Sequence, residues 1–69
     1  MKSTFKIKGE YIELAGLLKV LGWAENGGMA HSMVEDQQIV VNGEIELRKR
    51  AKLRPGDIVE FNGESVTME

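Results

Sequence analysis

The dipeptide Asn42-Gly43 constrains the fold of this chain more than any other feature, because it lies between two β-prone runs at residues 38–41 and 44–47. Asn-Gly favours a two-residue turn whose positive φ angles match the twist of paired strands. This stretch therefore predicts a β-hairpin near the middle of the chain.

Two further strands are predicted downstream of this hairpin. Residues 54–57, Arg-Pro-Gly-Asp, are typical of a turn, and the apolar-rich run at 58–61 is typical of a strand. A second Asn-Gly pair, at 62–63, predicts a return of the chain into a last strand at 65–68. The second half of the chain is thus expected to form a small, mainly antiparallel, twisted sheet.

The first part of the chain predicts a strand followed by a helix. Residues 4–8 alternate polar and apolar side chains, as in a half-buried strand. Four leucines with helical spacing then predict a helix over residues 12–21, which bears one buried stripe. Gly22 fits the left-handed position just past the end of that helix.

Asn26 is a favoured N-cap for a second helix, predicted over residues 27–35. Glycine is costly within a helix, so Gly27-Gly28 indicates a backbone that something approaches closely, either the first helix or a ligand. The predicted fold class is α+β, with a two-helix hairpin packed on a small, mainly antiparallel twisted β-sheet.

At 69 residues the chain is expected to form one domain, residues 1–69. It contains no cysteine and one histidine, His31, so we expect no disulfide, thiol nucleophile, metal site or cofactor. No serine combines with His31 and an acid in a catalytic pattern, so we expect no enzymatic activity. Because no apolar stretch resembles a membrane span or a leader, the sequence predicts a cytoplasmic protein.

Charge is distributed unevenly along the sequence. Residues 48–54 contain five basic residues and no acid, whereas the other sixty-two residues carry a formal charge of −7. An acidic domain binds a polyanion only where a basic segment forms a local patch that faces away from the acids. Residues 48–54 are the candidate for such a patch.

Five segments, in sequence order, resemble a known family. They are Leu17-Leu18-Lys19, Asn26-Gly27-Gly28-Met29-Ala30-His31, Ile39-Val40-Val41-Asn42-Gly43-Glu44, Arg48-Lys49-Arg50-Ala51-Lys52-Leu53 and Gly56-Asp57. Together, and most strongly over residues 14–57, they resemble the RNA-binding domain named after ribosomal small-subunit protein S-four, in its stand-alone bacterial branch. The resemblance implies an αL motif, in which a helical hairpin and a short sheet form a concave surface for structured RNA.

In that family, the residues that face RNA lie at the start of the second helix and on the basic loop after the hairpin. Both places suit phosphate, since a helix N-terminus offers free amides and long cationic side chains neutralise phosphate charge. The implied partner is structured RNA, such as ribosomal RNA or the ribosome, bound by a monomer. The resemblance implies an RNA-binding site that consists of Lys19, Asn26, Gly27, Gly28, Met29, His31, Arg48, Lys49, Arg50 and Lys52.

The chain departs from the family pattern at two positions. It has His31 where the family usually has lysine or arginine, and Gln37 where glycine is common. Because a histidine with an ordinary pKa is mostly neutral at pH 7, the second-helix side of the site is less basic than the family pattern implies.

Other interpretations of these residues stay open at this point. The basic run is equally typical of a solvated loop that protects a sheet edge, and Gly27-Gly28 is also consistent with tight helix packing. Trp23 is expected to be an anchor packed on the sheet rather than a stacking platform for bases. The alternative function is a β-grasp-like protein-interaction module, but the chain ends in Thr67-Met68-Glu69 rather than the Gly-Gly of small sulfur carriers.

Overall fold

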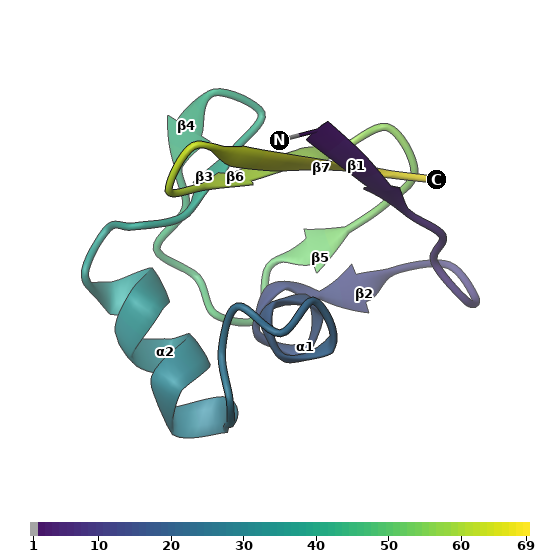
Figure 1. Cartoon of the computed structure of the whole chain (residues 1–69). Helices are drawn as coiled ribbons and strands as arrows, with labels where there is room; N and C mark the ends of the chain where they lie inside the picture. Colours follow the sequence, from purple (N-terminus) through teal and green to yellow (C-terminus); the bar gives the residue numbers. More distant parts are fainter. Residues whose placement is uncertain (1) are drawn as a thin grey trace.

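The computed structural model describes residues 2–69, in which two α-helices and seven β-strands are found (Figure 1). Met1, the first residue of the predicted domain, lies outside the described residues. Five strands form one sheet in the order β1-β7-β6-β3-β4, and β2 pairs with β5 in a separate two-stranded ribbon. The elements are β1 (Lys2–Phe5), β2 (Ile12–Glu13), α1 (Leu14–Val20), α2 (Gly27–Glu35), β3 (Val40–Val41), β4 (Glu44–Ile45), β5 (Lys52–Leu53), β6 (Ile58–Phe61) and β7 (Glu64–Met68).

The sheet is mainly antiparallel, since only β1 and β7 run parallel among its described strand pairs. Figure 1 shows the five-stranded sheet on one side of the molecule and both helices on the other, with the β2–β5 ribbon close to α1. The two helices pack against each other. These features confirm the predicted α+β class, a helical hairpin packed on a small twisted sheet. Neither helix in residues 2–69 has the length and apolar character needed to cross a membrane.

The hydrophobic core lies between the helices and the inner face of the sheet. Trp23, in the segment between α1 and α2, is half-buried, and its ring centroid lies 5.4 Å from that of Phe61 on β6. This contact confirms Trp23 as an anchor packed on the sheet. The fully buried large side chains are Leu14, Leu17, Leu18, Val34, Ile39, Leu53, Val59, Val66 and Met68.

The two predicted Asn-Gly turns are both present, and the first is tied to the turn at residues 54–57. Asn42 has a φ of 52°, and its side-chain amide donates to Asp57 Oδ1 at 3.0 Å while its Oδ1 accepts from the Ile58 N–H at 2.9 Å. The other carboxylate oxygen, Asp57 Oδ2, accepts from the Arg54 N–H at 2.8 Å. The Asn42 side chain therefore joins two turns that are distant in the sequence.

The first strand lies earlier in the chain than the predicted 4–8. Lys2 to Phe5 pair with β7, and Phe5 is opposite Met68, the last residue of that strand. Beyond Phe5 the pairing continues with Glu69, whose N–H donates to the Phe5 carbonyl at 2.8 Å and whose carbonyl accepts from the Ile7 N–H at 2.9 Å. The predicted inward face was correct, since Phe5 and Ile7 both contact the core. The hairpin strands β3 and β4 are likewise shorter than the predicted 38–41 and 44–47.

The first helix begins at Leu14 rather than at Ile12, because Ile12 and Glu13 form β2 and pair with Leu53 and Lys52 of β5. The side chain of Glu13 makes no capping hydrogen bond. Backbone carbonyls of a distant segment cap the helix instead: the Leu14 N–H donates to the Ala51 carbonyl at 2.9 Å, and the Ala15 N–H donates to the Lys49 carbonyl at 3.0 Å. The basic segment was expected to be a loop throughout, and part of it is this strand.

Candidate nucleic-acid interface

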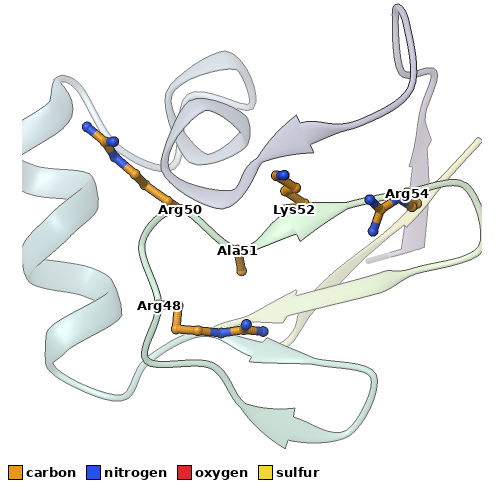
Figure 2. A pocket seen from close by; sticks show the side chains of 5 residues that line it. All are labelled: Arg48, Arg50, Ala51, Lys52 and Arg54. Atoms are coloured by element: carbon orange, nitrogen blue, oxygen red, sulfur yellow. The ribbon is translucent and has the colours of Figure 1, made fainter.

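Cationic side chains of the basic segment line a hollow of about 600 Å³ (Figure 2). The hollow is formed by Arg48, Arg50, Ala51, Lys52 and Arg54, and we call it the basic hollow. Four of these five residues are cations, although the whole chain has a formal charge of −2. The local patch that the charge distribution predicted is therefore present on the folded molecule.

Backbone hydrogen bonds to α1 hold the basic segment, residues 48–54, in place, and these contacts do not use its charged side chains. The carbonyls of Lys49 and Ala51 accept hydrogen bonds from α1, and Ala51 itself is buried in the core. Lys52 and Arg54, on and after β5, are exposed. Figure 2 shows the Arg50 side chain extending toward the side on which the two helices lie.

Arg48 differs from the other cations of the basic hollow because a carboxylate binds it. Its Nε and Nη2 donate to the two carboxylate oxygens of Glu46 at 3.0 and 3.1 Å, and its backbone N–H also donates to Oε2 at 3.1 Å. These hydrogen bonds hold the pKa of Glu46 below its ordinary value, although partial burial acts in the opposite direction. The same pairing raises the pKa of Arg48. Figure 2 shows the Arg48 and Arg50 side chains pointing away from each other.

Within residues 2–69 the structure contains a single ion pair, Arg48 with Glu46, so the side chains of Arg50, Lys52 and Arg54 form no ion pair with a carboxylate. Lys52 instead lies over the ring of Tyr11, with its Nζ 5.0 Å from the ring centroid. Arg54 was absent from the predicted site residues although it closes the predicted basic run. The continuous basic run at residues 48–54 was the sequence signal that could have included Arg54.

The N-terminus of α2 has the predicted cap and an open first turn. Asn26 Oδ1 accepts from the Met29 N–H at 2.8 Å, as expected for an N-cap. A Cβ added at Gly27 would meet no atom within 4 Å, and one added at Gly28 would meet only Asn26 Oδ1, at 3.4 Å. The interpretation of these glycines as a device for tight helix packing was therefore wrong. Neither glycine lies against α1 or the sheet on the side where a Cβ would be.

The remaining predicted residues lie outside the basic hollow. Met29 is exposed on α2, and its Sδ accepts from the Glu25 N–H at 3.5 Å. His31 is half-buried on the same helix, whereas Lys19 is exposed in the last turn of α1. The lining of the basic hollow comes entirely from residues 48–54, so the predicted site consists of two neighbourhoods, one on the basic segment and one on the helices.

Comparisons with known proteins agree with these features. A family model described as an S4 domain matches residues 5–69. The chain is 42% identical over 65 residues to the "Putative RNA-binding protein YbcJ" of Escherichia coli, with 93% of each chain covered. It is 35% identical over 63 residues to the "Probable ribosome maturation protein RlbA" of Bacillus subtilis, with 91% of this chain and 89% of that protein covered.

The solved structures include a similar one. The solution structure of YbcJ from E. coli, described as revealing an αL motif involved in RNA binding, matches with a TM-score of 0.70 and 41% identity. The match covers 94% of this chain and 84% of that one. None of these matches supports the β-grasp alternative.

Proposed function

The chain belongs to the S4 domain family, and we propose that it binds structured RNA, ribosomal RNA foremost, without catalysing a reaction. The observation that carries the proposal is the basic hollow, where four cations gather on a chain that is acidic overall. The relatives named for RNA binding and for ribosome maturation support both the class of partner and the ribosomal target.

In the proposed complex, the basic hollow binds the phosphate backbone. Arg50 and Arg54 offer planar guanidinium groups that suit bidentate contacts with phosphate, and Lys52 offers a compact charge between them. Arg48 is already neutralised by Glu46, so it contributes less to the attraction at long range. A duplex is recognised mainly through its shape, its phosphates and its 2′-hydroxyls, which fits a surface with few aromatic side chains.

The N-terminus of α2 supplies a second contact in this proposal. The amides of the first helical turn have no carbonyl acceptor within the helix, and Asn26 satisfies that of Met29. Gly27 and Gly28 leave the remaining amides sterically open, so a phosphate oxygen can approach them along the helix axis. We place Lys19, Met29 and His31 at the border of this second contact. The protein is expected to act as a monomer in the cytoplasm.

The experiment that tests the proposal compares two variants that each remove one positive charge. A hairpin RNA is titrated against the wild-type protein, Arg50→Gln and Lys2→Gln at several salt concentrations. We expect a wild-type slope of log affinity against log salt of about −2 to −4.5, corresponding to about three to five phosphates. Arg50→Gln is expected to flatten the slope by about 1, whereas Lys2→Gln, on the exposed strand β1, leaves it unchanged.

Equal slopes for the two variants would contradict the assignment of the basic hollow. Circular dichroism of each variant provides the control for folding. Because both positions are exposed, neither substitution removes a buried contact. Failure of the wild-type protein to bind any structured RNA, ribosomal RNA included, would overturn the proposed function itself.

A further inference from the structure

A second hollow, of about 420 Å³, opens between the β1–β2 connection and the end of α1. This volume lies within the range of about 300–1,000 Å³ that small-molecule sites occupy. Its lining is mostly apolar and leaves two large side chains unusually accessible, since Tyr11 is 39% exposed and Val20 is 64% exposed. We call it the Tyr11 hollow, and it is lined by Phe5, Lys6, Lys8, Tyr11, Ile12 and Val20.

The Tyr11 hollow adjoins the basic hollow. Lys52 lines the basic hollow, and its ammonium group lies 5.0 Å from the centroid of the Tyr11 ring, which lines the other hollow. The β2–β5 pairing holds this contact in place, because Leu53 of β5 is opposite Ile12, a further lining residue. A ligand that extends along β5 in the basic hollow therefore meets the aromatic ring next.

We propose that the Tyr11 hollow binds an unstacked nucleobase from a single-stranded segment that flanks the RNA helix held by the basic hollow. This inference rests on the proposed function and extends it from the phosphate backbone to a base. An apolar lining that contains an aromatic ring suits the face of a base, since base stacking on aromatic side chains tolerates every base. Lys6 and Lys8 at the same hollow suit the phosphates on either side of that base.

The charge of the lining favours an anionic occupant, such as an RNA strand, over a neutral or cationic one. Lys6 and Lys8 line the Tyr11 hollow, and the Lys52 ammonium group lies over the Tyr11 ring. The neighbouring acids are Glu10, Glu13, which is opposite Lys52 in the β2–β5 register, and Glu69, whose backbone pairs with Phe5 and Ile7. None of these acids lines the hollow itself, where the two charged side chains are lysines, as an anionic strand requires.

The test uses three RNAs that share one stem-loop. The first has a blunt end, the second carries two unpaired adenosines at each end, and the third carries the same extensions with abasic riboses. Affinities are measured by fluorescence anisotropy for the wild-type protein, Tyr11→Ala and Tyr11→Phe. Ile58→Ala is the matched control, because Ile58 is 40% exposed on β6, away from both hollows.

The wild-type protein is expected to bind the adenosine-extended RNA about 5- to 100-fold more tightly than the abasic one, as one stacked base contributes. Tyr11→Ala should abolish that preference, whereas Tyr11→Phe and Ile58→Ala should retain it. Equal wild-type affinity for the two extended RNAs, or a preference that survives in Tyr11→Ala, would overturn this inference. The proposed function would still stand if the blunt stem-loop bound and Arg50→Gln weakened it. No binding of any of the three RNAs would overturn both.

Discussion

Gly27→Ala is expected to stabilise the fold and weaken RNA binding at the same time. A Cβ at Gly27 would meet no atom within 4 Å, and the residue already has a helical backbone in the first turn of α2. Alanine restricts the unfolded chain more than glycine does, so a substitution at a compatible position stabilises by about 0.4–1 kcal/mol. In a domain of this size 1 kcal/mol shifts Tm by about 4–8 °C, so we expect a rise of about 2–8 °C.

The expected effect on RNA has the opposite sign because the methyl group would occupy the open approach to the α2 amides. A hydrogen bond to a charged group contributes about 1.5–3 kcal/mol, and each 1.4 kcal/mol corresponds to a tenfold change in affinity. Loss of one amide–phosphate contact is therefore expected to weaken RNA binding by about 10- to 100-fold. A purely structural glycine would show no such loss.

The assay combines thermal unfolding by circular dichroism with RNA titration by fluorescence anisotropy at one salt concentration. Gly16→Ala is the matched control, since its Cβ would lie 3.9 Å from Ile12 Cγ1, an ordinary contact, within α1. This control is expected to stabilise by about 1 kcal/mol without changing RNA affinity. A Gly27→Ala protein that gains stability and binds RNA as tightly as the wild type would refute the assignment of the α2 N-terminus to RNA.

Three further predictions concern the cap, the ion pair and the joined turns. Asn26→Asp keeps an N-cap acceptor, so Tm should stay close to that of the wild type, while the added negative charge at the α2 N-terminus should weaken RNA binding in a titration. Because the pKa of Glu46 is lowered, its pairing with Arg48 stabilises the fold fully at pH values above the ordinary pKa of 4.5. This stabilisation is lost as pH falls through the lowered pKa. Glu46→Gln should remove this part of the acid sensitivity. If the wild-type protein and Glu46→Gln lost equal stability in urea unfolding between neutral and acidic pH, the prediction would be wrong. Asn42→Ala removes both hydrogen bonds of that side chain to Asp57 and Ile58 and places alanine at positive φ, so urea unfolding should show a loss of about 1–3 kcal/mol.

Local signals in the sequence were sufficient for the turns and for the second helix. The Asn42-Gly43 and Asn62-Gly63 turns, the N-cap at Asn26 and the bounds of α2 at Gly27–Glu35 all match the structure. Each depends on the backbone preferences of a few adjacent residues, so the local sequence is sufficient to predict it. The buried stripe of leucines on α1 was predictable for the same reason.

Features set by distant partners were not predictable in the same way. The β2–β5 ribbon brings Ile12 opposite Leu53, about forty residues later, and two-residue strands carry too little pattern to be recognised. The neutralisation of Arg48 by Glu46 depends on the path of the loop backbone, which sequence spacing does not give. Tyr11 was missed as a neighbour of the basic segment because only the β2–β5 pairing brings it to Lys52.

Backbone hydrogen bonds, more than ion pairs, explain how an acidic domain of this size keeps several cations together. Gathered cations repel one another, which costs stability. The carbonyls of Lys49 and Ala51 anchor the middle of the segment by capping α1, and carboxylates bind its backbone N–H groups at the two ends, Glu46 at Arg48 and Asp57 at Arg54. Glu46 neutralises Arg48 alone, and the repulsion among Arg50, Lys52 and Arg54 remains. Phosphates of a bound RNA would relieve it, so binding and folding stability are coupled at this segment, and both the gain in stability on binding RNA and the affinity should fall as salt rises.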